Sequence, residues 1–133
     1  MTTDGGLRKI FRRRLRSVHW TTIETGIAER GVPDLHGTWQ GSSFWIENKR
    51  ARGWEIGLRP SQIGWLKRNA RSGGRAFVAV RKGSTLWLLH GAAASALRQQ
   101  GLRDLPAGGL AGCWQGGPAG WPWPAILALL ASP

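Results

Sequence analysis

The sequence has little cysteine, few acidic residues and no long apolar run. Cys113 is the only cysteine among 133 residues, which excludes an intramolecular disulfide and a zinc site built from cysteines. A single cysteine suits a reducing, intracellular compartment. The longest clean apolar run, residues 125–131, is far shorter than the ~20 residues that span a bilayer, and the basic N-terminus lacks the apolar region of a secretory signal. We therefore expect a cytoplasmic protein with no membrane partner.

Positive charge is the most prominent feature of the composition. Nineteen Lys and Arg residues face seven Asp and Glu residues, which gives a net charge of +12 at pH 7. Such an excess favours a polyanionic partner, because each phosphate that Lys or Arg contacts releases condensed counterions. Nucleic acid is the leading candidate, and non-specific binding of polyanions by a merely basic protein is the alternative.

The length and the apolar content, 41% of residues, predict one globular domain. Apolar spacing predicts an amphipathic basic helix over 6–16, and a proline start and glycine stop predict a helix from 60 to 73. A third helix is predicted over 92–100 and a short one over 124–131. Extended segments are predicted over 18–24, 33–39, 44–50, 76–81 and 85–90. This order predicts an α/β fold with a mixed sheet flanked by helices.

The chain divides by composition near residue 104. We expect residues 1–104 to form the core of the domain, including the basic N-terminal helix. Residues 105–133 are rich in glycine, proline and tryptophan, and we expect them to form an extension that packs on that core. Between 105 and 124 no periodicity indicates a strand.

Acidic residues cluster in this otherwise basic chain. Five of the seven lie between positions 24 and 55, namely Glu24, Glu29, Asp34, Glu47 and Glu55. Carboxylates repel phosphate and one another, so their gathering on a nucleic-acid-binding surface is costly unless a cation lies between them. A divalent metal is the simplest such cation.

The segment 44–50 carries Glu47 and Lys49 two residues apart among apolar side chains. On a strand these two side chains project from one face, about 7 Å apart along the chain, together with Trp45. If 33–39 and 44–50 form a hairpin, Asp34 lies on the neighbouring strand and can complete a two-carboxylate metal site. The plain structural alternative is a surface ion pair between Glu47 and Lys49, and a turn at Asp34.

These residues resemble a known family. Gly31-Val32-Pro33-Asp34, followed by Glu47-Asn48-Lys49 and then by Gln62 on a helix, resembles the PD-(D/E)XK nuclease superfamily. The G-x-P-D form with a later Gln is similar to the virus-type replication–repair nucleases (VRR-NUC), and more loosely to archaeal Holliday-junction resolvases. The resemblance covers about residues 15 to 90 and implies a restriction-endonuclease-like fold.

The resemblance also implies roles for individual residues. Asp34 and Glu47 would bind Mg²⁺ or Mn²⁺, with the carbonyl of Asn48, and Glu24 would hold the metal through water or bind a second ion. Lys49 would polarise the attacking water and meet the charge that develops on phosphorus, and Gln62 would brace Lys49 or the phosphate. Position 48 is often apolar in the family, so Asn48 is a departure from its pattern.

Several cations flank this predicted site. We expect phosphate contacts from Arg50, Arg52, Arg59, Lys67 and Arg68, and from Arg12 and Arg13 of the N-terminal helix. Trp54 is the tryptophan that we expect to stack on a base.

The resemblance implies a magnesium-dependent endonuclease acting on DNA, with four-way junctions or other branched DNA as substrate in recombination, repair or phage replication. It also implies a homodimer and a bacterial or phage-infected host cell. Two alternatives stay open at this point. One is a non-catalytic basic protein that holds nucleic acid, and the other is a nicking or restriction-like nuclease.

Overall fold

The computed structural model describes residues 3–24 and 30–132, which form one domain around a six-stranded sheet. The strands are β1 (His19–Thr22), β2 (Leu35–Trp39), β3 (Ser42–Arg50), β4 (Ala76–Lys82), β5 (Thr85–His90) and β6 (Leu110–Trp114). They lie side by side in the order of the chain. Only β3 and β4 pair in parallel among these strands, so the sheet is mixed, as predicted.

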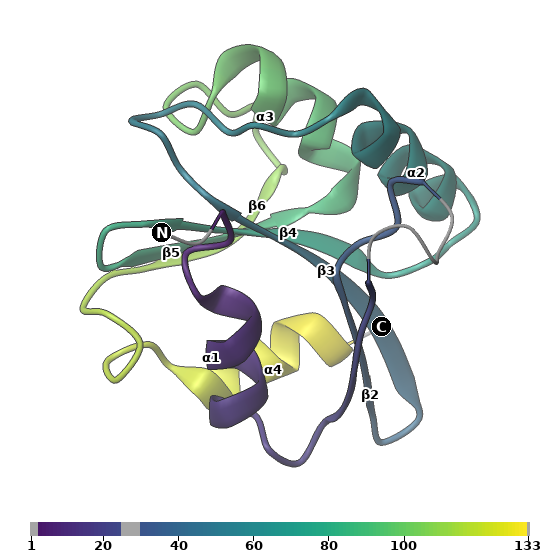
Figure 1. Cartoon of the computed structure of the whole chain (residues 1–133), viewed down its shortest axis with the longest axis vertical. Helices are drawn as coiled ribbons and strands as arrows, with labels where there is room; N and C mark the ends of the chain where they lie inside the picture. The colour runs from purple at the N-terminus through teal and green to yellow at the C-terminus, as the bar shows by residue number, and fades with distance from the viewer. Residues whose placement is uncertain (1–2, 25–29, 133) are drawn as a thin grey trace.

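Helices cover both faces of the sheet. The α-helices of the described residues are α1 (Leu7–Arg14), α2 (Pro60–Arg71), α3 (Ala94–Gln100) and α4 (Trp123–Ala131). Helices α1 and α4 lie on one side of the sheet, and α2 and α3 lie on the other (Figure 1). Each side has its own apolar core, with Phe11, Phe44 and Ile126 in the first and Leu66, Val78 and Leu97 in the second. This layered arrangement confirms the predicted α/β class.

A tight hairpin joins β2 to β3. Trp39 pairs with Ser42, which leaves only Gln40 and Gly41 in the loop. Both have positive φ, 48° and 81°, as a type I′ turn requires, and such turns match the twist of the flanking strands. The predicted hairpin is therefore confirmed, and it places the residue just before β2, Asp34, beside β3.

Helix α2 connects the parallel strands β3 and β4. It begins at Pro60, where the missing N–H costs no hydrogen bond, and Gly73 follows its last turn with a φ of 80°. Because α2 returns along the sheet, its first turn lies near the end of β3 that carries Glu47 and Lys49. The predicted strand–helix–strand unit is confirmed.

The prediction that 105–124 lacks a strand is wrong. Residues Leu110–Trp114 form β6, which pairs antiparallel with β5 at the edge of the sheet. The segment has no alternation of apolar and polar residues, so its extended shape follows from pairing with β5 and not from a local pattern. The predicted helix over 92–100 also differs, since it begins as a 3₁₀ turn, Gly91–Ala93, before α3.

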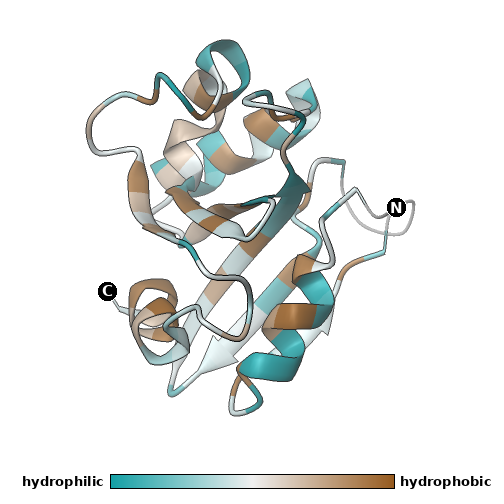
Figure 2. Cartoon of the chain, turned by 90° about the vertical axis from the view of Figure 1, so that its left-hand side faces the viewer, coloured by the Kyte–Doolittle hydropathy of each residue, from teal (hydrophilic) through white to brown (hydrophobic). Residues whose placement is uncertain are grey.

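The C-terminal segment contributes to the main core. Trp121, Ile126 and Leu130 are buried against residues of α1 and the sheet. Figure 2 shows α4 as mostly hydrophobic, whereas α1 alternates hydrophobic and hydrophilic bands along its length. The alternation on α1 fits the predicted amphipathic helix, whose Leu7 and Phe11 are fully buried.

Within residues 3–24 and 30–132, no helix has both the length and the apolar character needed to cross a lipid bilayer.

Candidate active site

A cleft of about 1190 Å³ opens beside β3. Four segments line it: the N-terminal arm with the start of α1, residues flanking the undescribed stretch 25–29, the second half of β3, and the first turn of α2. The described residues contain three buried polar or charged side chains, Glu47, Asn48 and Gln62, and all three line this cleft. Burying polar groups costs free energy unless they are hydrogen-bonded or retained for function, so the cleft is the candidate functional site.

Asp34 and Glu47 face each other across the hairpin. Leu35 pairs with Ile46 at the end of the β2–β3 ladder, which puts Asp34 at the next position, beside Glu47. Both carboxylates line the cleft, and the charge of Asp34 acts on Glu47. The ladder continues on the other side, because the Ile23 N–H donates to the Asp34 carbonyl at 2.9 Å. The structure thus brings the two predicted metal-binding carboxylates together.

Lys49 lies beside Glu47 on the same face of β3. Its Nζ is 3.7 Å from Glu47 Oε2, and the Lys49 side chain is 16% exposed. Trp45, two residues before Glu47, packs against Trp65 of α2, whereas Ile46 is buried in the core on the opposite side. The predicted alternation along β3 is confirmed, and the pair is not the solvent-exposed ion pair of the alternative interpretation.

Burial makes both carboxylates hard to ionise. Desolvation, followed by repulsion from Asp34, raises the pKa of Glu47 to about 8, although Lys49 and Arg59 act to lower it. Desolvation also raises the pKa of Asp34 to about 6, against the hydrogen bonds from Asn48 and the charge of Arg8. At neutral pH the pair therefore retains a proton unless a cation stabilises both charges.

Asn48 holds the Asp34 carboxylate. Its backbone N–H and its side-chain Nδ2 both donate to Asp34 Oδ1, each at 3.2 Å. The Asn48 side chain is buried, and its Oδ1 has no hydrogen-bond partner among the described residues. The cleft thus presents two carboxylates, and hard oxygen donors of this kind suit Mg²⁺ or Mn²⁺.

Gly31 brings the loop before Asp34 against helix α2. Its φ is 82°, in the left-handed region, and a Cβ built on it would lie 2.0 Å from the Ser61 carbonyl oxygen. Only glycine permits both the conformation and this approach. The glycine of the G-x-P-D motif therefore fixes the distance between the Asp34 loop and the first turn of α2.

We expect Gly31→Ala to destabilise the fold and to disturb the cleft. The methyl group must displace the Ser61 carbonyl, and left-handed backbone costs about 1–2 kcal/mol for alanine. Thermal denaturation should show a melting temperature lowered by roughly 5–15 °C. Gly41→Ala is the matched control, since it changes another positive-φ glycine with open space around it. An unchanged melting temperature for Gly31→Ala, or an equal loss for Gly41→Ala, would contradict the packing role.

Two further predicted residues line the cleft with different degrees of burial. Gln62 is buried, and its Oε1 accepts a hydrogen bond from the Arg59 N–H at 2.9 Å, which caps the first turn of α2. The bracing of Lys49 by Gln62 stays a prediction.

Glu24 is exposed at the edge of the cleft, and Glu29 lies outside the described residues. Glu55 lies in the loop after β3, paired through its backbone with Arg52, and does not line the cleft.

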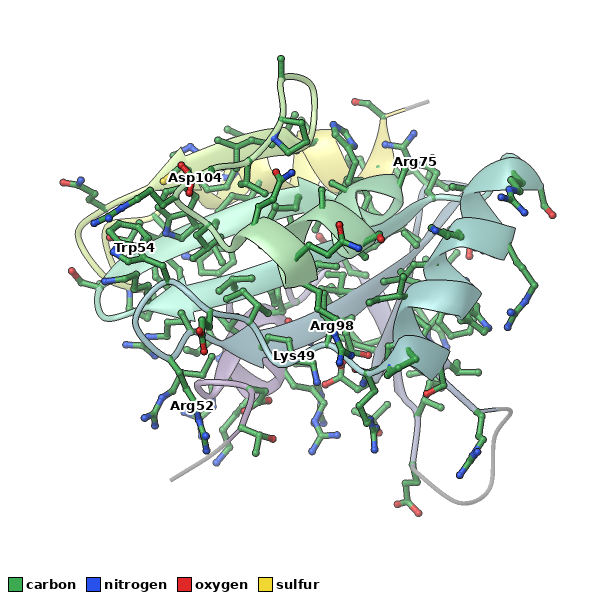
Figure 3. All side chains as sticks on the ribbon, turned by 90° about the horizontal axis from the view of Figure 1, so that it is seen from above. Lys49, Arg52, Trp54, Arg75, Arg98 and Asp104 are labelled. Atoms are coloured by element: carbon green, nitrogen blue, oxygen red, sulfur yellow. The ribbon has the colours of Figure 1, made fainter. Side chains whose placement is uncertain are left out.

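The predicted phosphate contacts only partly coincide with the cleft. Arg59 lines it, whereas the other predicted cations lie elsewhere on the surface of the described chain: Arg12, Arg13, Arg50, Arg52, Lys67 and Arg68. In Figure 3, Arg52 lies toward the same edge of the molecule as Lys49, while Arg75 lies at the opposite edge.

Two further cations line the cleft that the sequence analysis did not predict there, Arg8 and Arg30. Arg30 directly precedes the Gly31 motif, which is a usable signal, but nothing local to Arg8 indicates its place.

Trp54 lies outside the cleft, in the loop between β3 and α2. The residue is 39% exposed, with Lys82 Nζ at 4.4 Å and the Arg103 guanidinium carbon at 5.1 Å from the ring centroid. These cation–π contacts already occupy part of the indole. Stacking of Trp54 on a base stays a prediction.

Comparisons with known proteins add no assignment. No family model matches the chain, and no curated protein matches it. Within the part of the chain that the structure describes, no group of three or more His, Cys, Asp or Glu side chains gathers as a metal site. The candidate cation site in the cleft has two carboxylates, and its remaining ligands would be amide or carbonyl oxygen and water, as is common for Mg²⁺.

Proposed function

We propose that this chain is a magnesium- or manganese-dependent endonuclease of the PD-(D/E)XK type, with a restriction-endonuclease-like fold, that hydrolyses DNA phosphodiesters. One observation carries the proposal. Asp34 and Glu47 face each other in a cleft, with the Lys49 ammonium 3.7 Å from Glu47, in a chain of net charge +12.

The desolvated carboxylates favour hydrolysis over simple binding. A protein that only holds nucleic acid gains nothing from Asp34 and Glu47 in its cleft, because they repel phosphate and lose hydration on burial. Both costs are removed when a divalent cation lies between the carboxylates and a phosphate. The raised pKa values of Asp34 and Glu47 agree with this, because they show that the ionised carboxylates are poorly stabilised by the protein alone.

The residues of the cleft divide the work of hydrolysis among them. Asp34, Glu47 and the backbone carbonyl of Asn48 would hold the cation, which when bound polarises the phosphoryl group and lowers the pKa of a bound water. Lys49, held 3.7 Å from Glu47, orients the attacking water and faces the negative charge that grows on the phosphate oxygens. Arg8, Arg30 and Arg59, which line the cleft, bind the flanking phosphates and align the strand.

The proposed substrate is branched DNA, such as a four-way junction in recombination, repair or phage replication. This choice rests on the resemblance of residues 31–34, 47–49 and 62 to VRR-NUC and junction-resolving nucleases, as do the homodimer and the bacterial or phage-infected cytoplasm. A two-fold dimer would present two clefts to symmetric DNA. A nicking or restriction-like nuclease is the variant within the same class.

A cleavage panel tests the proposal. Purified protein is incubated with four-way, flap, duplex and single-stranded DNA in Mg²⁺, in Mn²⁺ and in EDTA. We expect cutting of at least one substrate with either cation, none with EDTA, and retained gel-shift binding in EDTA. Binding with no cutting of any substrate would instead support the non-catalytic alternative.

A further inference from the structure

We propose that Asn48 is a positioning residue, which fixes the Asp34 carboxylate for cation binding by donating to one of its oxygens and leaving the other oxygen for the ion. The inference rests on the proposed function, because it assigns Asn48 a task within the same site. It concerns the side chain of Asn48, in addition to the carbonyl oxygen that the sequence pattern suggests.

The hydrogen bonds give Asp34 one defined orientation. Asp34 precedes β2, so no β2 backbone carbonyl pairs with the Asn48 N–H, and the carboxylate takes that place. The Asn48 Nδ2 donates to the same Oδ1, so two donors converge on one oxygen. Asp34 Oδ2 receives neither of these bonds and is the oxygen available to a cation.

The amide of Asn48 is not explained by packing. Its neighbour on the same face of β3, Ile46, belongs to an apolar core, and a leucine of nearly the same shape as asparagine would suit such a place. The buried Asn48 Oδ1 has no hydrogen-bond partner, a cost that leucine would not incur. Rotating the amide would bring Oδ1 against Asp34 Oδ1, two acceptors, so the donor must face Asp34.

Asn48→Leu tests this role, because it keeps the backbone donor and removes the amide donor. Mn²⁺ affinity of the DNA-free protein is measured from the electron paramagnetic resonance signal of free Mn²⁺. We expect a dissociation constant about 10–100-fold higher than that of the unmodified chain, as for other groups that orient metal ligands. The melting temperature without cation should change by only a few degrees, since a purely structural asparagine would lower it and leave cation affinity unaltered.

Asn48→Ala and Asn69→Leu complete the design. Asn48→Ala removes the Nδ2 donor without adding a charge, so its thermal stabilisation by Mn²⁺ should be smaller than that of the unmodified chain. It also provides the measurement if Asn48→Leu fails to fold. Asn69→Leu is the matched control, because Asn69 on α2 also has a buried, unpartnered Oδ1 but lines a different cavity. Its Mn²⁺ affinity should be unchanged.

The outcomes separate the two proposals. If the unmodified chain binds Mn²⁺ and cuts DNA while Asn48→Leu binds Mn²⁺ equally well, the role of Asn48 is wrong and the proposed function stands. If the unmodified chain neither binds Mn²⁺ nor cuts, both are overturned. A loss of affinity confined to the Asn48 variants supports the inference.

Discussion

Replacing Lys49 with alanine should lower the rate of DNA cleavage at least 100-fold while leaving DNA binding nearly intact. The Lys49 ammonium is held 3.7 Å from Glu47 Oε2, so its position is set before substrate arrives. Removing one such preorganised charge from a site of phosphate or acyl transfer typically costs about 10²–10³ in rate. Binding depends on the 19 Lys and Arg residues together, and the loss of one changes it little.

Single-turnover cleavage and a gel-shift titration measure the two effects on the same preparation. Lys67→Ala is the matched control, because Lys67 is an exposed lysine of α2 outside the cleft. It should cut at close to the unmodified rate and bind slightly more weakly at low salt. If Lys49→Ala cleaves DNA at the unmodified rate, Lys49 has no role in the chemical step. If binding and cleavage fall in parallel, Lys49 only contacts phosphate.

The part of the site that sequence predicts is the part built from local geometry. Glu47 and Lys49 share a face because side chains alternate along a strand, and the short gap from Asp34 to Glu47 is a hairpin whose turn, Gln40-Gly41, is confirmed. Each of these relations spans about a dozen residues or fewer. A single sequence is informative at that range, because periodicity and turn chemistry act there.

The rest depends on contacts between distant segments. Arg8 reaches the cleft because α1 packs across the sheet, and no pattern around residue 8 encodes that distance from Asp34. The strand β6 forms because β5 offers a free edge, although Leu110–Trp114 has no strand periodicity. The amide of Asn48 meets Asp34 only because β2 begins one residue after Asp34. Tertiary pairing of this kind overrides local propensity.

Without a divalent cation, the stability of the fold should decrease as pH rises from about 4.5 to 8. Burial raises the pKa of Glu47 from 4.5 to about 8 and that of Asp34 from 3.8 to about 6. Between the unfolded and folded pKa values the folded chain binds more protons than the unfolded chain, so raising the pH favours unfolding. The penalty is absent below the unfolded values and complete above pH 8. We expect a loss of several kcal/mol, seen as a melting temperature lowered by roughly 10 °C or more.

Mg²⁺ should reverse this loss, because it binds the ionised carboxylates of the folded state and competes with their protons. The stabilisation by 5 mM Mg²⁺ should therefore be small at pH 5 and largest at pH 8, in melting curves recorded at constant ionic strength. Glu47→Gln is the matched variant, since it keeps the shape and removes the titrating group. The informative quantity is the difference between the unmodified chain and Glu47→Gln, because every group other than Glu47 is common to both. If that difference does not change with pH, Glu47 is not the buried carboxylate that the proposed hydrolytic site requires to bind the cation.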